Sequence, residues 1–105
     1  MLTLPIKKKW FDMILSGEKK EEYREIKPYW TTRLRNALYD LTMTSYFGSI
    51  VYARGTIRFK NGYQKNAPKI ECYIELTQGT GKPEWGAEPN KLYYVLKILS
   101  VEEIN

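Results

Sequence analysis

Two stretches of strictly alternating side chains constrain the fold of this chain more than any other feature. Residues 50–60 and 69–77 each place apolar and polar side chains in turn, which is the period of a half-buried β-strand. Asn61 and Gly62 follow the first stretch and are typical of a turn. The sequence therefore predicts two long strands that pair as a hairpin. The side chains expected to face the core are Val51, Ala53, Gly55, Ile57 and Phe59 on the first strand and Ile70, Cys72, Ile74 and Leu76 on the second.

The rest of the chain divides into helical and extended patterns. Apolar side chains at helical spacing predict helices over residues 5–16, with Pro5 at the first helical position, and over residues 28–37. The charged residues 19–26 predict a short, half-exposed strand, residues 41–49 a loop, and the apolar residues 92–101 a central strand. With 105 residues the chain has room for one domain. We expect a mixed α+β domain whose sheet curls into a small barrel.

The charge distribution predicts a basic surface near the N-terminal elements. Residues 1–60 hold twelve Lys or Arg against six Asp or Glu, whereas residues 61–105 hold five against six. Such an asymmetry suggests a phosphate-bearing partner, and the alternative is a solvated surface with spare lysines. The phosphate candidates are Lys7, Lys8, Lys9, Lys27, Arg33 and Arg35.

The lack of histidine and the single cysteine exclude several kinds of chemistry. Histidine-based mechanisms, internal disulfides and zinc sites with nitrogen and sulfur ligands are excluded, so we expect no metal and no cofactor. Cys72 falls on the inward face of its strand and is expected to be an inert core residue. The N-terminal basic run follows a short apolar stretch, the reverse of a signal peptide, and no apolar segment is long enough to span a bilayer. We expect a cytoplasmic protein without a membrane partner.

The segment after the first helix brings chemically useful side chains close together. Lys19 follows the expected helix end at Gly17, and Glu22 and Arg24 lie at the start of the expected strand. Such a cluster can hold an anionic or polar ligand while the carboxylate orients it. Strict alternation places Lys19 on the face opposite Glu22, so their convergence requires a turn or bulge around Lys19 and Lys20. The alternative is that Glu22 and Arg24 pair with outward neighbours on adjacent strands.

The same segment resembles the opening motif of the ASCH family. The family pattern Gly-x-Lys-x-x-Glu-x-Arg is matched by Gly17, Lys19, Glu22 and Arg24, and the pattern on its first helix by Trp10, Phe11, Ile14 and Leu15. The resemblance covers about residues 5–26 and is topological beyond them. It implies one ASCH domain over residues 1–105, a PUA-like β-barrel of about five to six strands with two flanking helices. Members of this family are proposed to bind RNA, so the resemblance implies RNA or a nucleotide-like ligand as the partner.

Some ASCH members resemble amidohydrolases that remove an acyl group from a modified cytidine with a lysine, a threonine and a glutamate. The lysine falls on Lys19, whereas Glu22 occupies the threonine position. Glu84 or Glu88 would supply the remaining carboxylate. A lysine base also requires a strongly lowered pKa, which a flanking Glu22 opposes.

A few other members resemble metal-independent ribonucleases that use a lysine, a tyrosine and a serine. Lys19 and Tyr23 match the first two, and Ser45 or Ser49 would be the third. A cation and a base near one phosphate are enough for such a reaction without histidine. A small enzyme acting on modified nucleosides or RNA is therefore the alternative to a binding function.

Aromatic side chains near the cationic ones complete the expected site, because aromatic rings stack on unpaired bases while cations hold phosphates. We expect a cleft between the first helix, the strand at residues 19–24 and the loop at residues 78–91. There Lys19 and Arg24 would contact phosphate or a base edge, and Glu22 would accept a hydrogen bond from the base. A protein-interaction module is a further alternative. The stacking candidates are Tyr29, Trp30, Tyr46 and Trp85, and Lys7 is the nearest cation of the first helix.

Other charged and aromatic side chains have structural explanations. Trp10 and Trp30 fit the apolar faces of their helices and are expected in the core. Outward-facing arginines on the first long strand lie opposite outward glutamates on the second, which predicts a cross-strand charge ladder. Its members are Arg54, Arg58, Glu71 and Glu75.

Overall fold

A hairpin of two long strands forms the centre of the sheet, as the alternation predicts. The computed structural model describes residues 1–38, 40–44 and 47–104. The hairpin strands are β4 and β5, and their antiparallel register confirms the predicted pairing. The elements are, in chain order, β1 (Thr3–Ile6), α1 (Lys8–Leu15), β2 (Glu21–Glu25), α2 (Pro28–Ala37), β3 (Leu41–Thr44), β4 (Ile50–Asn61), β5 (Lys69–Thr80), the 3₁₀ helix η1 (Pro83–Trp85) and β6 (Leu92–Ile104).

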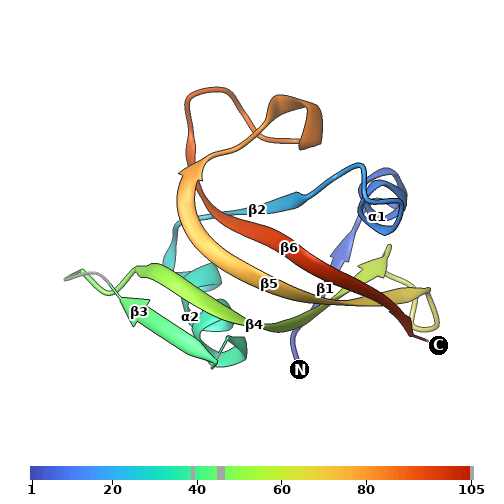
Figure 1. Cartoon of the computed structure of the whole chain (residues 1–105), viewed down its shortest axis with the longest axis horizontal. Coiled ribbons are helices and arrows are strands. Elements are labelled where there is room, and N and C mark those ends of the chain that lie inside the picture. Colours follow the sequence, from blue (N-terminus) through green and yellow to red (C-terminus); the bar gives the residue numbers. More distant parts are fainter. Residues whose placement is uncertain (39, 45–46, 105) are drawn as a thin grey trace.

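The sheet curls into a half-barrel (Figure 1). Its strand order is β1-β4-β5-β6-β2, and β3 pairs with β4 outside this path. β1 runs parallel to β4, whereas the other described pairs are antiparallel. β1 and β2 are the end strands of the order, so among the described strands each has a partner on one side only. We call the opening between β1 and β2 the seam. The predicted α+β domain with a curled sheet and two helices is confirmed at this level.

Apolar side chains from both hairpin strands and both helices fill the concave side of the half-barrel. β5 buries alternate residues, including Cys72 as predicted, and burial raises the pKa of the Cys72 thiol to about 12. α2 spans the predicted residues and begins with Pro28, which suits the first helical position. The core residues contributed by the helices and hairpin are Phe11, Ile14, Leu34, Leu38, Ile50, Ala53, Ile57, Phe59, Ile70, Cys72, Ile74 and Leu76.

The predicted helix over residues 5–16 is wrong at its start. Residues 3–6 form strand β1, and α1 begins only at Lys8. Leu4 and Ile6 are buried while the residues beside them are half-buried, a period of two that four residues are too few to reveal. Pro5 cannot donate to a sheet ladder, and an end strand tolerates it.

Two predictions for the region before β4 are also wrong. The predicted loop over residues 41–49 contains strand β3, which pairs with β4. Val51 was expected to face the core, but its side chain is exposed and Ile50 is buried instead. The register between the two strands shifts next to Thr44, and such a bulge reverses the faces of the residues beyond it.

The remaining strand predictions hold with changed lengths. The predicted strand 19–26 is shortened to β2, whose five residues pair with the first half of β6. β6 is central and buried over residues 93–96, where β5 and β2 flank it, and its second half extends beyond β2. In the described part of the chain, no helix is long and apolar enough to cross a membrane.

Gly55 packs directly against the end of α2, so we expect Gly55→Ala to destabilise the fold. A Cβ at Gly55 would lie 2.9 Å from the Cα of Leu38 at the end of α2, and this backbone atom has little freedom to move. Overpacking of this kind costs about 1–3 kcal/mol, which lowers the melting temperature by roughly 4–8 °C per kcal/mol. Gly79→Ala is the matched control, because a Cβ there meets only Val95 at an ordinary 3.9 Å. Equal melting temperatures for the two variants would contradict the tight contact.

Candidate functional site

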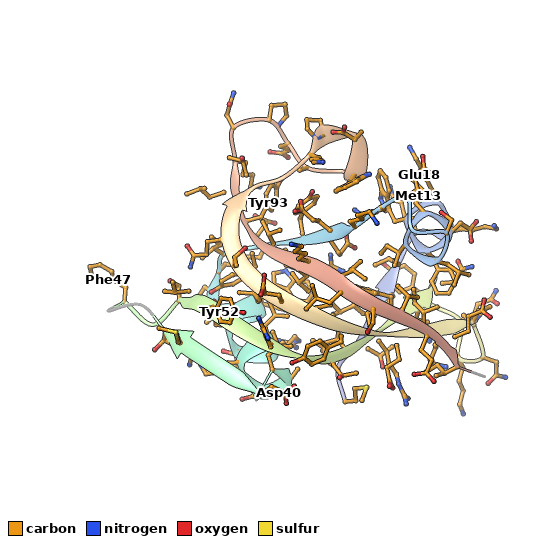
Figure 2. The ribbon with its side chains drawn as sticks, viewed as in Figure 1. Met13, Glu18, Asp40, Phe47, Tyr52 and Tyr93 are labelled. Carbon is orange, nitrogen blue, oxygen red and sulfur yellow. The ribbon has the colours of Figure 1, made fainter. Side chains whose placement is uncertain are left out.

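A cavity of about 260 Å³ opens at one end of the seam, where β1, α1, β2 and the connection between β5 and β6 meet. We call it the seam cavity. The connection, residues 81–91, is drawn in orange in Figure 1 and lies beside β2. Tyr93, labelled in Figure 2, stands at the base of this connection and accepts a hydrogen bond from the backbone N–H of Glu88. The cavity lining includes the aromatic residues Trp10, Tyr23, Tyr63, Trp85 and Tyr93 and the charged residues Lys7, Glu22 and Arg24.

Glu22 lies in the cavity wall between two cations. Its side chain is 8% exposed, and its two oxygens lie 3.2 Å from the Lys19 Nζ and 3.1 Å from the Arg24 Nη1. Oε1 also accepts from the backbone N–H of Tyr23 at 3.3 Å. Arg24 is 15% exposed and donates from Nη1 to the Tyr23 carbonyl at 2.7 Å. The predicted cluster therefore forms, and its carboxylate pairs within the cluster and not with an adjacent strand.

Lys19 reaches Glu22 because the chain turns sharply after α1. Gly17 adopts a left-handed backbone conformation with φ +85°, and the Lys19 N–H donates to the carbonyl of Met13 at 2.9 Å. This turn occupies the residues between α1 and β2, so the alternation of β2 does not extend back to Lys19. The turn that was required to bring Lys19 to Glu22 is therefore present.

The ammonium group of Lys19 is buried against residues of the cavity wall and contacts protein partners only. Its side chain is 0% exposed, and Nζ donates to the backbone carbonyl of Trp85 at 2.5 Å in addition to its ion pair with Glu22. Nζ also lies 4.8 Å from the ring centroid of Trp10 and 5.1 Å from that of Tyr23, both within cation–π range. Lys19 thus holds α1, β2 and the 81–91 connection together.

Lys19, Glu22 and Arg24 together carry one net positive charge in a mostly buried place, and the nearby Glu21 carboxylate also acts on Lys19. Burial lowers the pKa of Lys19, the charge and hydrogen bond of Glu22 raise it, and the charge of Arg24 lowers it again, with a net shift downward. Two cations share one carboxylate, so a further anion or a hydrogen-bond acceptor placed near Arg24 would be attracted. A hydrogen-bond donor would be attracted to the remaining lone pair of Glu22.

Tyr23 anchors the 81–91 connection over β2. Its phenol donates to Glu21 Oε1 at 2.8 Å and accepts from the backbone N–H of Lys82 at 2.9 Å. Burial raises the pKa of Tyr23, so the phenol keeps its proton at neutral pH. Gly86 has φ +101°, and a Cβ there would lie 3.1 Å from the Trp10 ring, so the connection packs directly on α1.

The predicted binding residues are distributed in three ways. Lys7, Glu22, Arg24 and Trp85 line the cavity, and Lys19 is buried against its wall. Tyr29 is 46% exposed on α2, packs against the ring of Trp30 4.8 Å away, and does not line the cavity. Trp10 and Trp30 were expected in the core, and both are half-buried against it. Trp10 also lines the cavity.

The remaining phosphate candidates surround α1 and α2. Lys8 and Lys27 form ion pairs with neighbouring carboxylates. Arg35 donates to a backbone carbonyl that precedes β4. Lys9 lies over the Trp10 ring, with Nζ 4.7 Å from its centroid, close to the cavity.

The residues named for the enzyme alternatives lie in different places. Glu84 is exposed on η1, and Glu88 is exposed and paired with Lys91. Ser49 accepts a hydrogen bond from Gln78. Ser45 and the stacking candidate Tyr46 lie outside the described residues. Within the described residues, no group of three or more His, Cys, Asp or Glu is arranged to hold a metal ion.

The predicted charge ladder is confirmed on the convex face of the hairpin. Arg54 pairs with Glu75 at 3.2 Å and Arg58 with Glu71 at 3.1 Å, each directly across the two strands. These arginines are therefore accounted for structurally. Their exposed ion pairs contribute little to stability.

Three cavity residues escaped the sequence analysis. Tyr93 is hidden in an apolar strand pattern, and Trp10 in a helical one. Tyr63 follows the Asn61-Gly62 turn, and the N–H of Gly62 donates to the carbonyl of Ile6, which brings Tyr63 beside the end of β1. An exposed tyrosine in a turn was a signal available for Tyr63.

Known proteins offer no direct parallel to this site. Comparisons of the chain with protein-family models, with curated proteins and with solved structures found no match. The function of the chain is therefore inferred from the geometry of the seam cavity and from the chemistry of its residues.

Lys19 is expected to make the stability of the protein rise with pH in the alkaline range. Its pKa in the folded protein lies below the 10.5 of an exposed lysine. Between these two values the unfolded chain binds more protons than the folded one, so the free energy of unfolding rises with pH. The Lys19→Met variant lacks this titration. Urea unfolding measures the free energy of unfolding of both proteins. As the pH is raised from about 7 to the pKa of an exposed lysine, the free energy of unfolding of the wild type should increase relative to that of Lys19→Met. A difference independent of pH would contradict the lowered pKa of Lys19.

Proposed function

We propose that the chain binds RNA, or a nucleotide-like ligand, by placing one nucleotide unit in the seam cavity. The observation that carries this proposal is a nearly buried carboxylate held between two cations in a cavity walled by aromatic rings. Cations that hold phosphate and rings that stack on unpaired bases are the two features that single-stranded RNA recognition requires. The cavity is smaller than the roughly 300–1,000 Å³ of a drug-sized site, which suits a single base.

Glu22 is the group proposed to read the base edge. An ionised carboxylate offers about four acceptor positions. Lys19 and the Tyr23 N–H use positions on Oε1, and Arg24 uses one on Oε2. The remaining position on Oε2 accepts a donor from the ligand, such as a base amino group. The ion pairs on both sides orient the carboxylate for this bond.

Arg24 and Lys7 are proposed to hold the phosphate. Arg24 uses one nitrogen for Glu22 and the Tyr23 carbonyl, which leaves the other N–H groups of its planar guanidinium for a ligand. Lys7 lines the cavity from the opposite side of the seam. The ring of Trp85, which lines the cavity and has the Lys82 ammonium 4.5 Å from its centroid, is the proposed stacking surface for the base.

We further propose that the chain is a single ASCH-type, PUA-like domain over residues 1–105. Two observations support this proposal. The pattern formed by Gly17, Lys19, Glu22 and Arg24 resembles the family motif, and all three of its charged members meet at the cavity. The curled sheet with two helices agrees with the small barrel that the resemblance implies.

Turnover of a modified nucleoside is the second candidate function, and the lowered pKa of Lys19 favours it. A buried lysine beside a carboxylate resembles the general base of the amidohydrolases, although Glu22 stands in the threonine position. Lys19 and Glu22 would then be catalytic, whereas Glu84 is exposed on η1. Incubation with acylated nucleosides tests this candidate, since release of the free nucleoside by the wild type and not by Lys19→Met would establish it.

Removal of the Arg24 guanidinium is expected to weaken RNA binding. In a fluorescence-anisotropy titration with labelled single-stranded RNA, Arg24→Gln should lose about tenfold or more in affinity, since it removes charge-assisted bonds to phosphate. Arg58→Gln is the matched control, because it removes the same charge from the convex face. Binding by the wild type should also weaken with added salt.

The control separates a specific site from a general attraction. Equal losses in Arg24→Gln and Arg58→Gln would mean that net charge alone attracts RNA, which contradicts the seam cavity as the site. Thermal melting of each variant confirms that it is folded at the temperature of the titration.

A further inference from the structure

A second, larger hollow lies at the other end of β1, between the N-terminus, α2 and β4. This hollow has a volume of about 560 Å³ and is lined by Met1, Leu2, Arg33, Asn36, Ala37 and Thr56. β1 connects the two, because Leu2 lies at the hollow and Ile6 at the seam cavity. At about 3.3 Å per residue, these positions are about 13 Å apart. Figure 1 shows β1 rising from the N-terminal end of the chain toward α1 along this path.

A chain of contacts between cations and aromatic rings links the seam cavity to the larger hollow. The Arg24 guanidinium, which lines the cavity, lies 5.0 Å from the ring centroid of Trp30. The Trp30 ring lies 4.8 Å from that of Tyr29, and the Arg33 guanidinium lies 3.5 Å from the Tyr29 ring. Arg33 in turn lines the larger hollow. We call Arg24, Trp30, Tyr29 and Arg33 the stacking row.

The charges along this path favour an anionic occupant. α2 carries Arg33 and Arg35 and no acidic residue. Glu22 is the one carboxylate among the described residues that line the two hollows, and both of its oxygens are already paired with cations. Tyr29 keeps nearly half of its surface exposed although its ring is flanked by an arginine and a tryptophan. An exposed ring beside a guanidinium group is a stacking platform for a base whose phosphate contacts the arginine.

We propose that the seam binds a single-stranded RNA over several nucleotides, with one nucleotide in the seam cavity and the following ones along the stacking row toward the larger hollow. This inference rests on the proposed function and extends it from one nucleotide to a strand. The path of about 13 Å accommodates about four steps of a stacked strand at 3.4 Å per step, and fewer of an extended one. A duplex is disfavoured as the ligand because its bases are not free to stack on protein rings.

The test compares a strand with single nucleotides on the same protein. The probe is a fluorescein-labelled, random-sequence RNA of about eight nucleotides, and the competitor is a mixture of the four nucleoside 5′-monophosphates. Tyr29→Ala and Arg33→Gln should each weaken binding of the strand by about fivefold or more and leave the competition by mononucleotides unchanged. Arg33→Gln should also reduce the slope of log affinity against log salt by about 0.7. Arg35→Gln is the control, because it removes the same charge from α2 at a residue that bonds outside the seam.

Each outcome separates the two proposals. If Arg24→Gln weakens binding of the strand but Tyr29→Ala and Arg33→Gln behave like Arg35→Gln, the extended path is overturned and the single-nucleotide site remains. If neither the strand nor the mononucleotides bind the wild type, both proposals fail. If oligoglutamate competes as well as RNA of equal charge, the row is an unspecific cationic surface, and the proposal for a strand is overturned.

Discussion

The buried ammonium group of Lys19 is the interaction on which the geometry of the site depends. A cation removed from water is costly unless partners replace its hydration. Here the partners come from three places: the Glu22 carboxylate on β2, the Trp85 carbonyl on η1 and the Trp10 ring on α1. The 81–91 connection must therefore close over β2 for Lys19 to be satisfied. The same closure places Trp85 over the cavity and turns Glu22 toward it.

The open half-barrel explains why the site lies where it does. β1 and β2 have four and five residues, too short to cover the long central hairpin, so the sheet does not close between them. A closed barrel would fill its interior with side chains, whereas an open seam leaves polar backbone edges and charged side chains facing a hollow. In this chain the charged motif lies on β2 at that edge. The opening of the sheet and the charged motif on β2 therefore lie at the same place, although different parts of the sequence determine them.

The elements with a clear period were predictable, whereas those defined by long-range contacts were not. The alternation of residues 50–60 and 69–77 predicted β4, β5 and the ion pairs of Arg54 and Arg58. β1 escaped prediction because its pattern is short and its pairing with β4 joins residues far apart in the chain. The exposure of Val51 depends on a bulge opposite β3, which no local pattern reveals.

The site itself was predictable only in its charged part. Lys19 can meet Glu22 only if the chain turns after α1, and the left-handed conformation of Gly17 provides this turn. The aromatic residues of the cavity come from segments distant in sequence, so no sequence pattern linked Tyr63 and Tyr93 to one site. Burial of the Lys19 side chain was also unexpected, because a lysine after a helix is normally solvated. Its consequence is that Arg24 and Lys7 line the seam cavity, whereas Lys19 does not.

The central claim is that a base stacks in the seam cavity, and the tryptophan side chains report on it directly. The chain has three tryptophans, each with one indole N–H signal in a proton–nitrogen NMR spectrum. Titration with a mixture of nucleoside 5′-monophosphates should shift the signals of Trp10 and Trp85 together, with one common saturation, because both rings line the cavity. Unchanged Trp10 and Trp85 signals at saturating nucleotide would contradict the account.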